Sequence, residues 1–212
     1  MKLYLIRHGQ SEANKKGIIQ GHANFPLTTL GKKQAVFVGH FFSDVHLDAI
    51  YSSDLDRAYE TAKGIEYHHP LSIRSWDQLR EVGLGPLEGK SRDQVKEEFP
   101  QISTHSLLLS GVEGSETQEE ITKRCRYVLD QLYAAHQNNT VALVSHGGFL
   151  SILLMYMIAG ESWHKLTRPF IIGNTGISHI EYDENEQVKF HYINRTSHLE
   201  KGESLQSSTV LY

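Results

Sequence analysis

The sequence predicts an α/β protein of three layers, in which helices cover both faces of a mostly parallel central sheet. Two apolar runs, residues 3–6 and 141–144, have the length and composition of strands that are buried on both faces. Strand-like and helical segments alternate along the chain, as they do in such sheets. A chain of 212 residues with 39% hydrophobic residues fits one domain, spanning residues 1–212.

The other elements follow from the spacing of apolar residues and from capping and turn signals. We expect them in this order: a helix opened by Gly31, a short strand at 48–53, a helix from 55 to about 67, an exposed strand at 71–76, a short helix from 91 that Pro100 stops, a helix from 117 to about 136, a buried helix at 149–159, and strands at 177–182 and 187–193. The last two strands form a hairpin, because residues 183–186 have the composition of a turn.

Polar residues mark three helix starts. Ser53 and Asp54 are expected to cap the helix that follows them. Ser91 and Thr117 each begin a capping box. Arg57 is different, because it places a cation in the first turn of a helix, at the positive end of the helix dipole. That charge becomes favourable if an anion binds at the same helix start, so Arg57 is a candidate anion ligand.

Residues 101–114 show no clear periodicity, and Leu107–Leu109 form an apolar triplet within them. We expect an irregular, mobile cover over the site at about residues 98–117. An ordinary surface excursion packed by the three leucines fits the pattern equally well. The tail from about residue 197 is polar, and the sequence leaves open whether it docks or stays loose.

Charge and hydropathy exclude several classes of partner. The net charge is −4 and the longest basic runs are pairs of lysines, so neither nucleic acid nor an anionic membrane is an expected partner. The apolar stretch at 149–159 is too short to span a bilayer. The N-terminus lacks a secretion signal, so we expect a cytoplasmic protein. The oligomeric state stays open, and a homodimer is one of the candidates.

The residues that follow the two buried strands are the first functional signal. His8-Gly9 ends one strand and His146-Gly147 ends the other. Because ligands bind at the carboxyl ends of parallel strands, one sheet would bring both imidazoles to one pocket. A lone histidine at a strand end is commonly a structural hydrogen-bonding group, but the repetition favours a site.

A set of short motifs occurs in a fixed order over residues 1 to about 150. The motifs are Arg7-His8-Gly9 with Ser11 and Asn14; Gln20-Gly21; Pro26-Leu27-Thr28 with Gly31; Ser52-Ser53-Asp54-Leu55 with Arg57-Ala58 and Thr61-Ala62; Glu81 with Gly83; Leu87-Glu88-Gly89; and Ser145-His146-Gly147-Gly148. Each motif is weak by itself, whereas the ordered set is highly specific. In this order it resembles the histidine phosphatase superfamily, in its phosphoglycerate mutase-like branch, and implies the fold of that branch.

The resemblance implies a phosphate site around His8, the nucleophile that becomes a phosphohistidine. A neutral imidazole suits this role, because it offers one lone pair to phosphorus while a backbone carbonyl holds the proton on its other nitrogen. Phosphoryl transfer depends mainly on positioning and charge stabilisation, so neither a metal nor another cofactor is expected. The groups expected around the phosphoryl oxygens are Arg7, Arg57 and His146, with Asn14, Gln20 and the Gly147 amide as further donors.

The resemblance also implies that Glu81 is the general acid, because the leaving alkoxide needs a proton. The alternative is a surface carboxylate paired with Arg80. Glu88 matches the same family pattern and is expected to close a turn.

The remaining candidates are weaker. His22 lies in the loop after the nucleophile and could touch a substrate, although a solvated loop is the simpler interpretation. His68-His69 and the single Cys125 lack the companions of a metal site. Residues 83–89 do not have the spacing of a dinucleotide-binding loop.

The acceptor of the phosphoryl group distinguishes a phosphatase from a mutase. A phosphoglycerate mutase needs further cations for a second anionic group, but residues 101–114 contain no Lys or Arg. In those mutases the catalytic glutamate is followed by Arg-His-Tyr-Gly, whereas Glu81 is followed by Val82-Gly83. We therefore predict a metal-independent phosphomonoesterase with broad or small-metabolite specificity. The alternatives are a 2,3-bisphosphoglycerate-dependent phosphoglycerate mutase and a non-catalytic binder of phosphorylated ligands.

Overall fold

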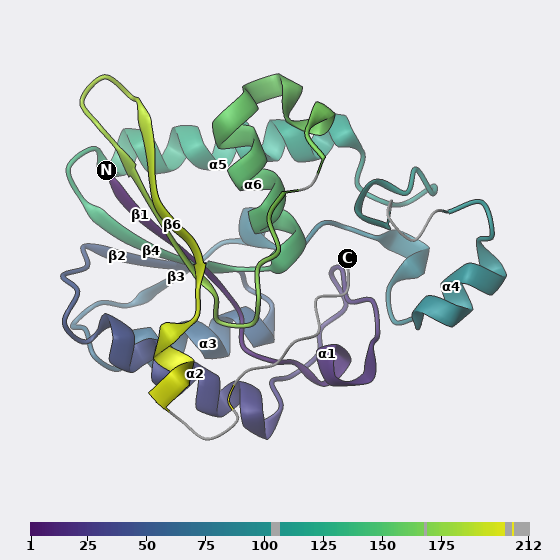
Figure 1. Cartoon of the computed structure of the whole chain (residues 1–212), viewed down its shortest axis with the longest axis horizontal. Coiled ribbons are helices and arrows are strands. Elements are labelled where there is room, and N and C mark those ends of the chain that lie inside the picture. Colours follow the sequence, from purple (N-terminus) through teal and green to yellow (C-terminus); the bar gives the residue numbers. More distant parts are fainter. Residues whose placement is uncertain (103–106, 168, 202–204, 206–212) are drawn as a thin grey trace.

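The computed structural model describes residues 1–102, 107–167, 169–201 and 205, and it has one six-stranded sheet (Figure 1). The strand order across the sheet is β3-β2-β4-β1-β5-β6. β1 to β4 pair in parallel, β5 is antiparallel to β1, and β6 is antiparallel to β5. The strands are β1 (Lys2–Arg7), β2 (Ala49–Ser52), β3 (Ile73–Ser75), β4 (Thr140–Ser145), β5 (Ile177–Tyr182) and β6 (Val188–Arg195). The mostly parallel sheet and the final hairpin are therefore confirmed.

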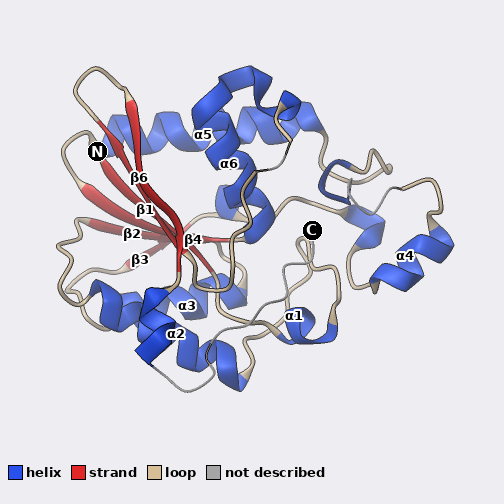
Figure 2. Ribbon diagram, viewed as in Figure 1, coloured by secondary structure: helices blue, strands red, loops and turns tan. Residues whose placement is uncertain are grey.

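Helices lie on both faces of this sheet, as predicted (Figure 2). α2 and α3 cover one face, and α5 and α6 cover the other. The helices are α1 (Glu12–Lys16), α2 (Thr29–Phe42), α3 (Asp56–Glu66), α4 (Arg92–Glu98), α5 (Gln118–His136) and α6 (Gly147–Ala159).

Alternation along β1 explains why the apolar strands have no polar face. Leu3 and Leu5 pack into the core that contains α5 and α6, whereas Ile6 packs into the core under α2 and α3. β4 divides its residues in the same way, with Leu143 on one side and Val144 on the other. Burial on both faces fixes the register of the two central strands, which places their carboxyl ends side by side.

Two capping predictions are confirmed, and one is wrong. Ser91 and Thr117 both form capping boxes. The helix after Ser53 and Asp54 has Leu55 at its N-cap position, with no side-chain cap. The hydroxyl of Ser53 accepts a hydrogen bond from the amide of Leu55 at 3.3 Å and also bonds to His146, while the side chain of Asp54 bonds to Arg80.

The described part of the predicted cover packs against the protein. Leu107–Leu109 form a 3₁₀ turn, and Leu107 and Leu108 are buried in the core shared with α5 and α6. These two leucines match the packed alternative rather than a mobile segment, whereas residues 103–106 lie outside the described residues.

The described part of the tail also packs against the protein. Residues Ser197–Lys201 form another 3₁₀ turn, in which His198 and Leu199 are buried. Leu205 is buried too, and its carbonyl accepts a hydrogen bond from Gln34. Residues 202–204 and 206–212 lie outside the described residues. Within the described ranges, no helix is long and apolar enough to cross a membrane.

Candidate active site

The carboxyl ends of β1 and β4 bring His8 and His146 together. The two strands are neighbours in parallel register, with Arg7 opposite Ser145, so each histidine is the next residue after a paired one. Their ring centroids lie 5.1 Å apart, and both side chains are buried. The predicted convergence of the two imidazoles is therefore present in the structure.

A single hydrogen bond determines which nitrogen of His8 can act as a nucleophile. Nδ1 of His8 lies 2.6 Å from the carbonyl oxygen of Gly9. Because a carbonyl only accepts, Nδ1 carries the proton and Nε2 carries the lone pair. Burial and the nearby guanidinium groups of Arg57 and Arg7 hold the pKa of His8 well below its ordinary value of 6.5. At neutral pH the ring is therefore neutral, as nucleophilic attack requires.

Arg57 is fully buried in the first turn of α3, where the sequence predicted a cation. Its Nε donates to Nδ1 of His146 at 3.2 Å, and its Nη1 and Nη2 donate to the carbonyls of Ala23 and Gly21. An arginine Nε always carries hydrogen, so Nδ1 of His146 is the acceptor and the proton of the ring is on Nε2. That Nε2–H donates to the hydroxyl of Ser53 at 2.9 Å. Ser53, predicted as a helix cap, is thus a partner of His146.

Glu81 is almost completely buried, with an exposed fraction of 2%. Its carboxylate accepts hydrogen bonds from the backbone amides of Gly148 at 3.0 Å and Phe149 at 2.7 Å, in the first turn of α6. Arg80 pairs with Asp54 instead, so the surface pairing of Glu81 with Arg80 is wrong.

Gly148 makes this contact sterically feasible. A Cβ atom at this position would lie 2.7 Å from Oε1 of Glu81 and 2.8 Å from a methyl group of Leu108. Leu108, from the predicted cover, therefore packs beside the carboxylate and the start of α6. Gly147, the preceding residue, is buried at the first position of the same helix.

Ser11 orients the two amide side chains that were expected to bind phosphate. Its hydroxyl lies 3.1 Å from Oδ1 of Asn14 and 2.7 Å from Oε1 of Gln20. Each amide oxygen therefore faces Ser11, and each NH₂ group points away from it. Among the described residues, Nδ2 of Asn14 is buried and has no hydrogen-bond partner, so it is suited to donate to a bound anion.

The loop before β5 is a part of the site that the motifs did not identify. The side chain of Asn174 donates to the carbonyl of His8 at 3.1 Å and to Oδ1 of Asn14 at 3.2 Å. Nη1 of Arg7 donates to the carbonyl of Ile172 at 2.8 Å. Because β5 runs antiparallel to β1, its amino end meets the carboxyl end of β1. The predicted strand at 177–182 was the available signal for this placement.

Two weaker candidates have defined structural contacts. Nε2 of His22 lies 2.8 Å from the carbonyl of Glu81, so His22 is more than part of a solvated loop. Glu88 accepts hydrogen bonds from the amides of His22 and Leu84 and joins two loops, as expected of a structural residue. Over the described ranges, no group of three or more His, Cys, Asp or Glu side chains is placed to hold a metal ion.

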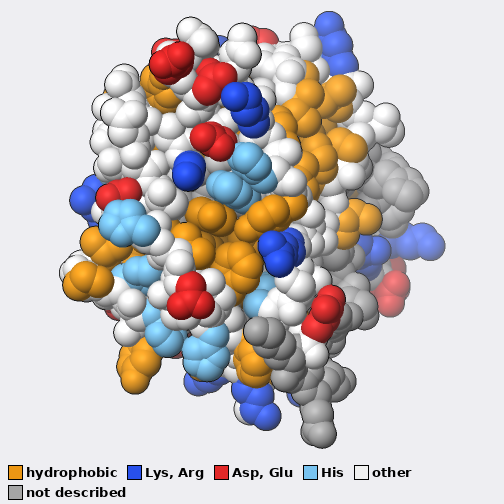
Figure 3. Space-filling model, turned by 60° about the vertical axis from the view of Figure 1, so that its left-hand side comes forward, with side chains coloured by type: hydrophobic (Ala, Val, Ile, Leu, Met, Phe, Trp, Pro, Cys, Tyr) orange, Lys and Arg blue, Asp and Glu red, His pale blue; other side chains and the backbone are white. Residues whose placement is uncertain are grey.

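The buried histidines predict that the protein loses stability in mild acid. Burial lowers the pKa of both His179 and His198 to about 4, and the pKa values of His8 and His146 are also lowered. Histidine side chains gather on one face of the molecule (Figure 3). The ring of His179 stacks on that of Tyr4, with ring centroids 4.3 Å apart. Below pH 6.5 the unfolded chain binds protons that the folded chain does not, so stability falls as the pH falls towards 4.

We expect the midpoint of thermal unfolding to drop by about 5 °C or more between pH 7 and pH 5. Calorimetry at several pH values measures this, and His198→Gln should reduce the slope. A midpoint that does not change over this range would contradict the interpretation.

Comparisons with known proteins identify the family of the chain. The histidine phosphatase superfamily (branch 1) matches residues 3–195. A protein provisionally named phosphoserine phosphatase 2, from Hydrogenobacter thermophilus, is 33% identical over 200 residues, which are 93% of this chain and 97% of the relative. A protein provisionally named phosphoglycerate mutase GpmB, from Salmonella choleraesuis, is 30% identical over 93% of this chain and 92% of its own length.

A solved structure shows the same fold. A mutant phosphoserine phosphatase from Entamoeba histolytica, in complex with phosphoserine, is 30% identical, with a TM-score of 0.76 over 93% of this chain and 98% of that one. A second structure of that phosphatase holds 3-phosphoglyceric acid. This chain belongs to the histidine phosphatase superfamily.

Proposed function

We propose that this chain is a phosphomonoesterase that transfers a phosphoryl group from a small phosphorylated metabolite to His8 and then to water. The observation that supports it most strongly is a continuous set of contacts at the carboxyl ends of β1 and β4. There the ring of His8 lies against that of His146, which is bonded to Arg57, while Glu81 is bonded to the helix that follows His146.

In the first step, Nε2 of His8 attacks phosphorus. A P–N bond forms, the P–O bond to the leaving group breaks, and Glu81 donates a proton to the leaving alkoxide. The proton stays on Nδ1, which keeps its hydrogen bond to the carbonyl of Gly9, and that carbonyl stabilises the positive charge that develops on the ring.

In the second step, water attacks the phosphohistidine. The Glu81 carboxylate now accepts a proton from the water, the P–N bond breaks, and its electron pair returns to Nε2 of His8. Inorganic phosphate leaves, and Glu81 is protonated again for the next cycle. The reaction balances without a metal or other cofactor.

Charged and polar groups stabilise the phosphoryl oxygens in both steps. Arg7 and Arg57 supply two buried guanidinium groups, which are worth more in a buried site than in water. Asn14 offers its NH₂ group. Gln20, the Gly147 amide and His146 complete the proposed set. Both ring nitrogens of His146 are bonded within the protein, so His146 orients Arg57 directly and meets phosphate only if it leaves Ser53.

The proposed substrate class is a small phosphorylated metabolite. Phosphoserine and 3-phosphoglyceric acid, held by the Entamoeba phosphatase, are compounds of this class and are the first to test. The resemblance to a protein named as a mutase makes mutase activity the second candidate.

One assay separates the two candidates. Purified protein is given 4-nitrophenyl phosphate and phosphoserine, and, in parallel, 3-phosphoglycerate with 2,3-bisphosphoglycerate. We expect release of inorganic phosphate to be faster than formation of 2-phosphoglycerate, and a chelator to leave the rate unchanged. Mutase turnover exceeding hydrolysis would overturn the phosphatase assignment.

We also propose that residues 1–212 form one domain, in which the described residues of 98–117 (98–102 and 107–117) border the site. The packing of Leu108 beside Glu81 supports this, because it links that segment to the proposed acid. A cytoplasmic location and a homodimeric state remain predictions.

A further inference from the structure

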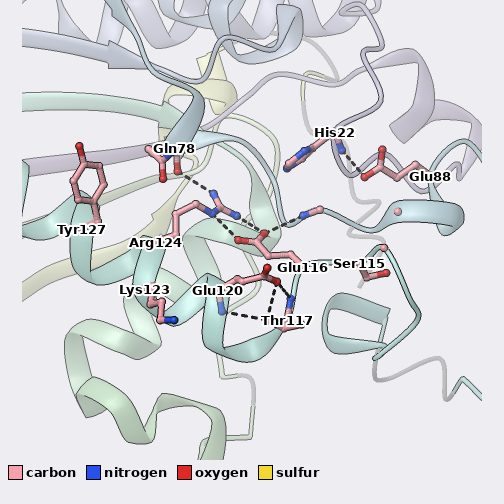
Figure 4. A pocket seen from close by; sticks show the side chains of 13 residues that line it. His22, Gln78, Glu88, Ser115, Glu116, Thr117, Glu120, Lys123, Arg124 and Tyr127 are labelled. Carbon is pink, nitrogen blue, oxygen red and sulfur yellow. Dashed lines mark hydrogen bonds and ion pairs between the residues drawn. The ribbon is translucent and has the colours of Figure 1, made fainter.

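A half-buried ion pair, Arg124 with Glu116, lies next to the segment that carries Glu81, and neither of its residues belongs to the proposed site. Arg124, in α5, forms two hydrogen bonds to the carboxylate of Glu116: from Nε at 2.8 Å and from Nη2 at 2.7 Å. The side chains are 11% and 14% exposed. Figure 4 shows the two groups pointing towards each other across the pocket that they line. Two charge-assisted hydrogen bonds between a planar guanidinium and one carboxylate fix the geometry of the pair, so it is a rigid feature.

The other hydrogen bonds of Arg124 all go to the segment that carries Glu81. Nη1 donates to the carbonyls of Gln78 and Arg80 at 2.9 and 2.8 Å, and Nη2 donates to that of Glu81 at 3.3 Å. With the two bonds to Glu116, all five N–H donors of the guanidinium have acceptors. Arg124 is thus fully used within the protein.

Two further contacts extend this support to the other side of Glu81. Glu116 accepts a hydrogen bond from the amide of Gly83 at 3.0 Å, two residues after Glu81. The guanidinium carbon of Arg124 also lies 4.3 Å from the ring centre of Phe149, whose amide donates to the Glu81 carboxylate. The pair therefore contacts the Glu81 backbone and one of the groups that hold its carboxylate.

We propose that Arg124, held by Glu116, is a positioning residue that fixes the Glu81 carboxyl group in line with the leaving group. The proposal rests on the function proposed above, in which Glu81 is the general acid. A proton donor works only within a narrow range of position, and an error of about 1 Å can cost about 100-fold in rate. Lysine keeps the charge but has no planar array of five donors, so it cannot replace arginine here.

Arg124→Lys tests the proposal through its dependence on the leaving group. An alkyl phosphate such as phosphoserine needs the general acid, whereas 4-nitrophenyl phosphate releases a stable phenolate and needs it much less. We expect kcat/KM for the alkyl ester to fall about 10- to 100-fold, and that for the aryl ester to change less than about threefold. Arg126→Lys is the matched control, because Arg126 lies on the same helix and pairs with Glu161 on the surface, and it should change neither value.

Each result supports or overturns a defined statement. The variant must first be shown to unfold above the assay temperature. If it then loses the same activity on both esters, or loses none on either, the pair is merely structural and the proposal is overturned. If Arg124→Lys does not fold, Glu116→Gln replaces it and is expected to show the same selectivity. Glu81→Gln is the reference. If Glu81→Gln loses more activity on the alkyl ester than on the aryl ester and Arg124→Lys does not, only the positioning role of Arg124 is overturned. If Glu81→Gln loses the same activity on both esters, the role of Glu81 as general acid is overturned as well.

Discussion

Replacing His8 with asparagine should lower kcat/KM on every phosphate ester by about 10⁴-fold or more, because the variant has no nucleophile. The asparagine amide can still donate to the carbonyl of Gly9, as Nδ1 of His8 does, so the loop should keep its shape. The effect should be the same for alkyl and aryl esters, since both must react with the same nitrogen.

The intermediate can be detected directly. P–N bonds survive alkali but not acid, so an alkaline quench of the parent enzyme with ³²P-labelled substrate should leave label on the protein, and His8→Asn should carry none. His136→Asn is a suitable control, because His136 is also buried but bonds to Tyr51 and Asn139. Activity of His8→Asn close to that of the parent would disprove the phosphohistidine mechanism.

The sequence was sufficient to place the two histidines and Arg57. Each is fixed by a local feature: a fully apolar strand that ends on a histidine, or a cation in the first turn of a helix. The parallel pairing of β1 with β4 then follows from burial of both faces, and it brings His8 and His146 together without any further information.

Contacts between distant segments could not be predicted in the same way. Ser53 has the pattern of a helix cap, but its hydroxyl bonds to His146, which lies 93 residues further along the chain. The same hydroxyl also accepts a local hydrogen bond from the amide of Leu55, and only the folded packing brings His146 to it. Asn174 was missed for a related reason, since its role depends on the antiparallel entry of β5 at the edge where His8 lies.

The support of Glu81 is the least visible feature in the sequence. No sequence motif singled out Arg124 or Glu116, and their importance depends on which carbonyls face the guanidinium. Local pattern predicts elements and their polar ends well, whereas the residues that orient a catalytic group come from loops and helices that meet only in the folded chain.

Replacing Glu81 with glutamine should cost about 10²–10⁴-fold in kcat/KM on alkyl phosphates and much less on 4-nitrophenyl phosphate. Oε1 of the carboxylate accepts hydrogen bonds from the amides of Val82 and Phe149, and Oε2 accepts one from that of Gly148, so glutamine loses at least one of the three. Some stability will therefore be lost, and the rate on the aryl ester corrects for it, because that rate does not depend on protonation of the leaving group.

Glu88→Gln is the matched control for this measurement. Glu88 is also a carboxylate that accepts backbone amides, in its case those of His22 and Leu84, but both bonds go to one oxygen, which glutamine retains. This variant should treat the two esters alike. If Glu81→Gln also treated them alike, the proton would have to reach the leaving group from another source, and the role of Glu81 would be reduced to holding the start of α6.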